Sequence, residues 1–326
     1  MELRPLGDSG LSVSLIGLGC NNFGWRIDEK QTHRVVDAAL GAGITFFDTA
    51  DIYGDGASER QLGAALSSCR EDVIIATKFG HRNGPDFGLP KGSRKHVRRA
   101  TEDSLRRLGT DYIDLQYQHN PDPDTPIDET LGELWALMDE GKIRAIGCTN
   151  VTARQLADAE ATARMAGRPH FSVLQGRYSI INNAVGAEMM PKCRAYGMGF
   201  VPWCPLESGL LTGKYRRNES PPANSRLAAW RMDISEEEWD KADRRPRLRG
   251  SSESRGFSWR WAGSPRSRRL RRSSPERRVP SRSHRMSRPP RGGSPRPTCR
   301  VWSPNDEEAH DQGDQHRPTG GRNLAE

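Results

Sequence analysis

Four polar side chains in this 326-residue sequence have the types needed to deliver a proton to a substrate. Each stands directly after a short apolar run or in the loop behind one, and they are Asp48, Tyr53, Lys78 and His119. Residues so far apart in sequence act together only where the fold brings the ends of these runs to one place. Parallel strands do this, because they all end on the same side of their sheet.

The four residue types together predict general acid catalysis at a carbonyl group. Tyrosine is a poor acid near neutral pH, because its ordinary pKa is about 10. A neighbouring cation such as Lys78 stabilises the phenolate and lowers that pKa, and Asp48 would keep the lysine charged and oriented. His119 can donate a hydrogen bond to a carbonyl oxygen, and general acid help of this kind is worth roughly 10²–10⁴ in rate.

Alone, each of these residues also has an ordinary structural explanation. A strand-end aspartate can cap a turn, a loop tyrosine can pack against its neighbours, a lysine can be solvated, and a histidine can be buried with its hydrogen bonds satisfied. Their joint placement at three successive strand ends favours the catalytic interpretation.

Apolar runs alternate with segments of helical periodicity over the first 241 residues. Seven runs are candidate strands, at 14–18, 44–47, 73–76, 112–115, 143–146, 171–174 and 199–203. Helical periodicity occupies 32–40, 93–108, 130–138, 153–165 and 186–195. This alternation predicts parallel strands joined by helices, and the polar turn at residues 7–10 predicts a small hairpin before the first strand.

Such a pattern fits either an open doubly wound sheet or a closed barrel. Gly17 and Gly19 begin like a dinucleotide-binding fingerprint, but Asn22 stands where a third glycine should pack the helix on the strand. We therefore interpret the glycine pair as a tight turn leaving the first strand. The Rossmann interpretation weakens accordingly, and we favour an α/β fold of the (β/α)8 TIM barrel type.

These segments resemble the aldo-keto reductases, and among them the bacterial members similar to the potassium-channel β-subunit group. The resemblance covers most of residues 1–241 and is carried by 41–54 with Ser58-Glu59, by Thr77-Lys78, and by 111–119, 141–147 and 205–215. It implies a barrel without a Rossmann domain, a nicotinamide dinucleotide that is usually NADP(H), and reversible hydride transfer to an aldehyde or ketone. Within that family Tyr53 would be the general acid, Lys78 and Asp48 its tuning pair, and His119 the group that orients the carbonyl.

The resemblance also implies a cofactor site at the ends of the later strands. Polar residues would hold the nicotinamide amide, an aromatic residue would stack on its ring, and the following loop would lie along the pyrophosphate. These residues are Thr149, Asn150, Gln175, Trp203, Pro205, Leu206 and Lys214. The chain departs from the family pattern at Arg177, where an acidic residue is common, and at Asn183, where arginine is frequent. Those departures leave the substrate open.

The composition changes abruptly near Lys241. Residues 1–241 carry 29 Lys and Arg against 33 Asp and Glu, whereas 242–326 carry 21 Arg, no Lys and 9 acidic residues. The net charge of +8 therefore divides into −4 and +12. We assign 1–241 to a barrel domain with seven legible strands, and 242–326 to an Arg/Ser/Pro-rich disordered tail in which the eighth strand–helix unit is unrecognisable.

Three interpretations of the tail remain open. A shifted reading frame of a GC-rich gene gives this composition and is the one we favour. The others are a basic tail that binds RNA or acidic surfaces, and a solvated extension that has no effect on function. If the eighth unit is missing, the affinity for the cofactor should fall more than the rate of the chemical step. A non-catalytic nucleotide-sensing subunit with the same pocket is the alternative function.

The remaining expectations concern surroundings and partners. The sequence shows no signal segment and no run of roughly 18 apolar residues, so we expect a cytoplasmic protein without a membrane partner. Its six cysteines are scattered, which predicts reduced thiols and no metal site. We expect a small carbonyl compound as substrate and no nucleic acid as partner.

Overall fold

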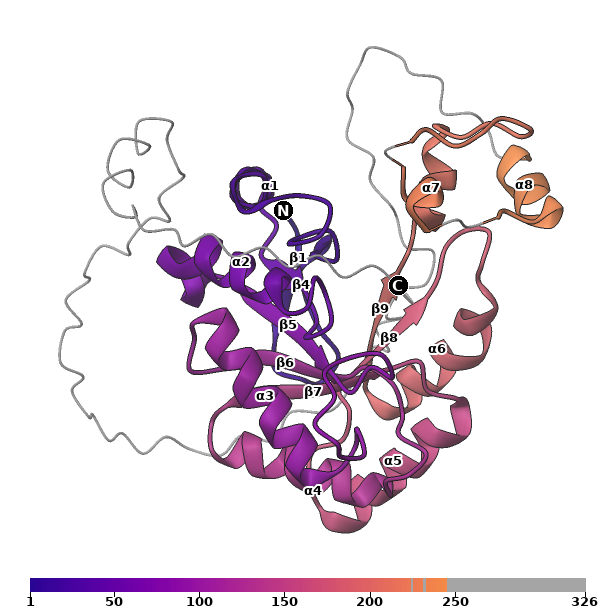
Figure 1. The fold of residues 1–326 in the computed structure, drawn as a ribbon. Helices are drawn as coiled ribbons and strands as arrows, with labels where there is room; N and C mark the ends of the chain where they lie inside the picture. Colours follow the sequence, from indigo (N-terminus) through magenta and orange to yellow (C-terminus); the bar gives the residue numbers. More distant parts are fainter. Residues whose placement is uncertain (224, 231–232, 245–326) are drawn as a thin grey trace, which may run out of the picture. The chain divides into compact units, whose positions relative to one another are not determined.

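The computed structural model describes residues 1–223, 225–230 and 233–244 (Figure 1). An antiparallel hairpin of β1 (Leu3–Pro5) and β2 (Ser12–Ser14) opens the fold. It confirms the hairpin predicted from the polar turn at 7–10. The predicted tail lies outside the described residues except for positions 242–244, and Cys299 lies outside them too.

Seven parallel strands form one sheet, in which they pair side by side in chain order. They are β3 (Gly17–Gly19), β4 (Phe46–Asp48), β5 (Ile74–Phe79), β6 (Ile113–Gln118), β7 (Ile143–Thr149), β8 (Val173–Arg177) and β9 (Gly199–Trp203). A helix follows each of the first six, namely α1 (Glu29–Gly41), α2 (Ala57–Leu66), α3 (Arg94–Leu108), α4 (Ile127–Asp139), α5 (Ala153–Ala166) and α6 (Ala184–Tyr196). This alternation confirms the predicted TIM barrel class. Among the described residues, β3 and β9 are the two edge strands of the sheet, and each pairs with one neighbouring strand.

Four shorter segments complete the described chain. They are the 3₁₀ helices η1 (Ser67–Asp72) and η2 (Glu207–Thr212), and the helices α7 (Arg226–Trp230) and α8 (Glu236–Asp243). The sequence patterns predicted neither these segments nor α2. None of the helices in the described ranges is long and apolar enough to cross a membrane.

Local sequence explains where the helices begin and end. Asp28 and Gln31 form a capping box at the start of α1, and Thr152 and Gln155 form one at the start of α5. Such boxes satisfy backbone N–H groups that have no partner inside the helix. Gly109 ends α3 in the left-handed conformation, which glycine adopts without strain.

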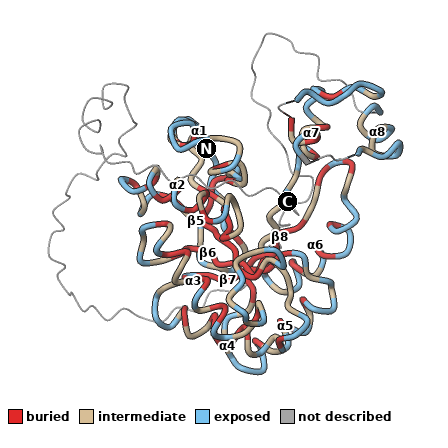
Figure 2. The backbone as a smooth tube through the Cα atoms, in the orientation of Figure 1, coloured by how far each residue is buried: buried red, intermediate tan, exposed pale blue. Residues whose placement is uncertain are grey.

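Buried apolar side chains form three clusters in the described residues, of which two lie on the two faces of the sheet and a small one joins Ile181, Leu210, Tyr215 and Leu227. Phe46, Leu115, Tyr117, Ala145 and Val173 belong to the cluster that the strands form among themselves. The larger cluster joins the strands to the helices that cover them. Figure 2 shows buried residues along the strands and on one side of each covering helix. Burial on both faces explains why the strands read as apolar runs in the sequence.

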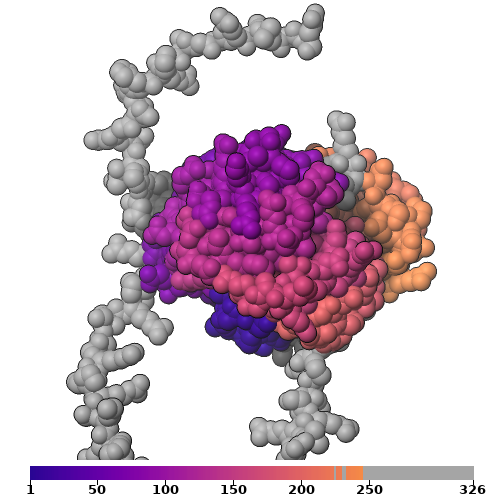
Figure 3. Space-filling view, turned by 90° about the horizontal axis from the view of Figure 1, so that it is seen from below, coloured from indigo at the N-terminus to yellow at the C-terminus, as the bar shows by residue number. Residues whose placement is uncertain are grey.

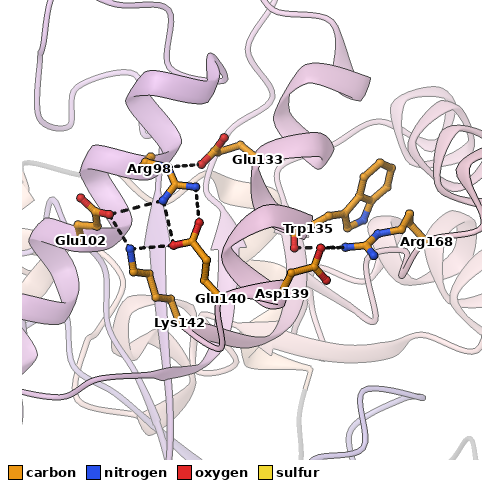
Figure 4. Close-up of polar contacts among 8 residues, drawn as sticks. All are labelled: Arg98, Glu102, Glu133, Trp135, Asp139, Glu140, Lys142 and Arg168. Atoms are coloured by element: carbon orange, nitrogen blue, oxygen red, sulfur yellow. Dashed lines mark hydrogen bonds and ion pairs between the residues drawn. The ribbon is translucent and has the colours of Figure 1, made fainter.

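Helices α3, α4 and α5 form a continuous surface in the view of Figure 3. An ion-pair network joins α3 to α4 and to the start of β7 (Figure 4). Arg98 lies 2.6 Å from Glu133 and 2.7 Å from Glu140, both measured from guanidinium nitrogen to carboxylate oxygen. Lys142 Nζ contacts Glu102 at 2.7 Å and Glu140 at 2.9 Å. Glu140 therefore bridges two cations.

The structure corrects the prediction for the first barrel strand. The apolar run at 14–18 is divided, because Ser14 ends the hairpin and the barrel strand is only Gly17–Gly19. The two glycines therefore form the strand itself, and the tight turn predicted for them was wrong. Close packing requires Gly17, since a Cβ there would lie 2.7 Å from a ring carbon of Phe46.

Candidate active site

Lys78 and Asp48 form an ion pair at the ends of two neighbouring strands. Asp48 is the last residue of β4, and Lys78 is the last but one of β5. Lys78 Nζ donates to Asp48 Oδ1 at 2.5 Å and to the backbone carbonyl of Thr49 at 2.8 Å. The lysine side chain is only 1% exposed, whereas that of Asp48 is 15% exposed. Removing a cation from water is costly, so these contacts are what allow Lys78 to lie there.

Tyr53 and His119 complete the set predicted from the sequence. Lys78 Nζ lies 3.4 Å from the Tyr53 hydroxyl oxygen, and the Tyr53 ring stands nearly perpendicular to the His119 ring at 6.2 Å between centroids. The backbone N–H of His119 donates to the carbonyl of Phe79 at 2.8 Å, which ties the end of β6 to β5. The fold thus brings all four residues to one place.

Burial and charge set the protonation states at this site. Burial by itself lowers the pKa of Lys78, but Asp48 and Tyr53 outweigh it and raise that pKa above its usual range. Burial raises the pKa of Tyr53. Lys78 acts to lower that pKa, as expected from the sequence, but the effect of burial is larger. Burial, with smaller contributions from Lys78 and His81, lowers the pKa of His119 to about 2. At neutral pH the site therefore holds an ammonium group, a protonated phenol and a neutral imidazole.

Two amide side chains expected to bind a cofactor also contact the four-residue set. Gln175 Nε2 donates to Asp48 Oδ2 at 2.9 Å, and Asn150 Nδ2 donates to the backbone carbonyl of His119 at 2.9 Å. Asn150 follows β7 with a left-handed backbone (φ 59°), a conformation that asparagine tolerates better than most residues. Thr149 ends β7 beside Gln175 and is buried.

The other residues expected at the cofactor site lie at the end of β9 and in the following loop. Trp203 ends β9 with 38% of its surface exposed, and Leu206 is 45% exposed. Pro205 and Lys214 are exposed as well, and Lys214 Nζ lies 5.1 Å from the centroid of the Tyr215 ring. An exposed indole followed by a loop with a lysine fits a flat ring joined to a pyrophosphate.

Arg177 and Asn183, the two departures from the family pattern, have different surroundings. Arg177 Nη2 lies 2.6 Å from Glu207 Oε2, and the Glu207 side chain is buried. This ion pair fixes the loop after β9 to the end of β8. Asn183 precedes α6 and makes no capping hydrogen bond with its side chain.

Two residues around the site, His81 and Tyr117, were not predicted from the sequence. The His81 ring lies 4.7 Å from the His119 ring between centroids, and the Tyr117 ring lies 6.0 Å from Lys78 Nζ. The position of His81 three residues after Lys78, just past a strand end, was the available signal. In the described part of the chain, no group of three or more His, Cys, Asp or Glu residues could hold a metal ion.

Comparisons with known proteins agree with this architecture. The family model described as "Aldo/keto reductase family" matches residues 15–243. A Glycine max protein described as "Probable aldo-keto reductase 1" is 39% identical over 237 residues, which cover 70% of this chain and 66% of that protein. Two proteins described as "Probable voltage-gated potassium channel subunit beta", from Oryza sativa subsp. japonica and Arabidopsis thaliana, are 37% and 36% identical over 235 residues. Those matches cover 70% of this chain and 70% of each relative, so the chain spans about two thirds of the length of its relatives.

Proposed function

Because this chain belongs to the aldo/keto reductase family, we propose that it is an NADP-dependent oxidoreductase that reduces an aldehyde or ketone to an alcohol. The observation that carries the proposal is the position of Lys78 Nζ, within hydrogen-bonding reach of both Asp48 and Tyr53. No simple structural need accounts for a buried lysine that contacts a carboxylate and a phenol at a strand-end rim. Proton delivery to a substrate accounts for it directly.

In the proposed reaction Tyr53 is the general acid. Its hydroxyl gives a proton to the carbonyl oxygen while that oxygen gains negative charge, and the ammonium of Lys78 stabilises the phenolate left behind. Asp48 keeps Lys78 protonated and fixes its position. His119 is neutral, so it donates a hydrogen bond to the carbonyl oxygen without adding a charge, and it orients the substrate.

The bound nicotinamide dinucleotide would supply the hydride. We assign its amide to Thr149, Asn150 and Gln175. Because the Asn150 amide nitrogen already donates to the His119 carbonyl, its side-chain oxygen is the group that can accept from the nicotinamide amide.

Trp203 would stack on the nicotinamide ring, and the loop with Pro205, Leu206 and Lys214 would lie along the pyrophosphate. The sequence beyond Lys241 contains no recognisable segment for binding the 2′-phosphate. We therefore expect the KM for NADPH to be higher than it would be with that segment present.

Tyr53→Phe tests the proposal, with Tyr196→Phe on α6 as the matched control. We expect Tyr53→Phe to lower kcat for aldehyde reduction by about 10² or more, since the general acid is removed. Its Kd for NADPH, measured by fluorescence quenching, should stay within about twofold of the wild-type value, because the acid does not hold the dinucleotide. Turnover retained by Tyr53→Phe would refute the assignment.

A second candidate is a nucleotide-responsive subunit that binds the dinucleotide without turnover. The descriptions of the rice and Arabidopsis relatives as potassium channel subunits favour it. Quenching of NADPH fluorescence with no oxidation of NADPH by any member of a broad aldehyde panel would support this function over the reductase. A third, nucleic-acid binding through the Arg-rich tail, concerns residues outside the described part. It predicts salt-dependent binding that is lost on truncation after Lys241.

A further inference from the structure

The ammonium group of Lys78 has three N–H bonds and three oxygen atoms around it. Nζ lies 2.5 Å from Asp48 Oδ1, 2.8 Å from the backbone carbonyl oxygen of Thr49 and 3.4 Å from the Tyr53 hydroxyl oxygen. The Thr49 carbonyl belongs to the backbone, so it moves only when the chain after β4 moves. Its position therefore helps to set the direction in which the ammonium group faces, and with it the contact between Lys78 and Tyr53.

A series of hydrogen bonds fixes Thr49 to the helix that follows it. The hydroxyl oxygens of Thr49 and Ser58 are 2.8 Å apart, and Ser58 Oγ lies 2.9 Å from the backbone carbonyl oxygen of Cys20. A carbonyl only accepts and a hydroxyl has one hydrogen, so Ser58 donates to Cys20 and Thr49 donates to Ser58. The backbone N–H of Cys20 in turn donates to the Asp48 carbonyl at 2.8 Å. These hydrogen bonds connect the ends of β3 and β4 with α2.

Ser58 is also connected to the proposed general acid. Its backbone N–H donates to the carbonyl of Tyr53 at 3.2 Å. Residues 54–56 between them all have positive φ angles, so the chain turns sharply from Tyr53 into α2. One residue of α2 therefore contacts the backbone of Tyr53 through its N–H and the side chain of Thr49 through its hydroxyl.

Burial makes these hydrogen bonds specific. Cys20, Thr49 and Ser58 are all 0% exposed. A buried hydroxyl or carbonyl that loses its partner cannot turn to water instead, and the loss is costly. Because both hydroxyl hydrogens have an acceptor, the hydrogen bonds favour a single arrangement of the chain around Lys78.

We propose that Ser58 is a positioning residue for proton transfer from Tyr53. Its hydroxyl holds Thr49, and the Thr49 carbonyl orients Lys78. Its backbone N–H holds the loop that carries Tyr53, so the phenol and the ammonium group stay within reach of each other. A displacement of about 1 Å in a reacting group can slow a reaction by about 10². This inference deepens the proposed reductase function and rests on it.

Ser58→Ala tests the inference, with Ser14→Ala at the end of β2 as the matched control. The Ser14 hydroxyl is also buried, and it donates to the Ile16 carbonyl at 2.7 Å and accepts from the Thr45 N–H at 3.0 Å. Both variants should lower Tm by about 2–8 °C. Only Ser58→Ala should lower kcat for aldehyde reduction, by about tenfold. Its KM for the aldehyde and its Kd for NADPH should stay within about twofold of the wild-type values.

A second pair of variants separates the hydroxyl group from packing. Thr49→Val keeps nearly the same shape without the hydroxyl, whereas Thr49→Ser keeps the hydroxyl and loses a methyl group. Thr49→Val should reproduce the loss in kcat, and Thr49→Ser should stay close to wild type. The ratio of kcat in H2O to kcat in D2O should rise in Ser58→Ala and Thr49→Val, because proton transfer from Tyr53 becomes slower relative to the other steps. Equal losses for Thr49→Val and Thr49→Ser, or the same isotope ratio in all variants, would contradict the inference.

Crystal structures of the variants separate the inference from the proposed function, because they require no turnover. In Ser58→Ala, Lys78 Nζ should lie out of hydrogen-bonding reach of the Tyr53 hydroxyl, and in Ser14→Ala it should stay within reach. An unchanged contact between Lys78 and Tyr53 in Ser58→Ala would overturn the inference even in an active reductase. A wild-type protein that reduces no aldehyde would instead count against the proposed function.

Discussion

The side-chain amide of Gln175 donates a hydrogen bond to Asp48 Oδ2 at 2.9 Å, across 127 positions of sequence. Gln175 belongs to β8 and Asp48 to β4, which are not neighbours in the sheet. Since Lys78 occupies the other carboxylate oxygen, both oxygens of Asp48 are held. Gln175 therefore positions the Asp48–Lys78 pair, a role separate from the cofactor contact proposed for it.

Replacing Gln175 should alter the pH profile of the enzyme. Gln175→Glu puts a second carboxylate against Asp48, and like charges at this distance raise the pKa of one of them. We expect kcat at pH 8 to fall at least about tenfold, with partial recovery near pH 5 where the pair can share a proton. Gln175→Met removes the donor without adding charge and serves as the control, with a smaller loss and no recovery at low pH. Parallel pH profiles for the two variants would argue against a positioning role.

In a double-mutant cycle at the Asp48–Lys78 pair, the second substitution should restore stability without restoring activity. Lys78→Met leaves the largely buried carboxylate of Asp48 without its cation, which should cost about 3–5 kcal/mol in the free energy of unfolding. Adding Asp48→Asn removes the unpaired charge and should restore most of that loss. Carbonyl reduction should stay absent in both proteins. Urea denaturation and NADPH oxidation measure the two quantities, and a double variant no more stable than Lys78→Met would contradict the prediction.

Asp51 should make the protein less stable as the pH rises. The residue is 1% exposed, and neither carboxylate oxygen has a hydrogen-bond partner in the described part of the chain. Burial, then the charge of Glu59, raise its pKa to about 7. The folded state therefore keeps a proton that the unfolded chain releases near its ordinary pKa of about 3.9, so this contribution falls between about pH 4 and pH 7.

Asp51→Asn removes this titration. Its stabilising effect on the free energy of unfolding should be small near pH 4 and grow to about 2–4 kcal/mol at pH 8. Urea denaturation at pH 5 and pH 8 measures the difference. Asp37→Asn on α1, at a partly exposed position, is the control for the same substitution outside the core. A gain that is equal at both pH values would show that the carboxyl group does not titrate in this range.

The ion-pair network between α3 and α4 should stabilise the fold in a salt-dependent way. Arg98 contacts three carboxylates, and one of them, Glu133, is 8% exposed. Arg98→Ala should therefore lower the free energy of unfolding by about 1–2 kcal/mol, and the loss should shrink at 1 M NaCl. Arg164, whose side chain is 75% exposed, makes a single pair with Glu160 and is the control, with an expected effect below about 0.5 kcal/mol. Equal effects of the two substitutions would refute the prediction.

The sequence predicted the barrel strands well where a run has consecutive apolar residues that face both sides of the sheet, as at residues 73–76, which overlap Ile74–Phe79. It failed at Gly17–Gly19, because two of the three residues there are glycines and the strand carries almost no apolar signal. The helix Ala57–Leu66 was missed because Leu62 and Leu66 are its only apolar side chains larger than alanine. Periodicity reports burial, and elements with few large apolar side chains are weakly marked by it.

The sequence by itself determined the order of the barrel strands and the placing of Asp48, Lys78 and His119 at strand ends, since apolar runs, caps and turns are local signals. Only the tertiary structure decided that Gln175 reaches Asp48 and that His81 lies against His119, because contacts across a sheet depend on register and on how the strands curve together. Burial likewise appears only in three dimensions. That is why the pKa of Tyr53 rises although Lys78, which the sequence identified as its partner, acts to lower it.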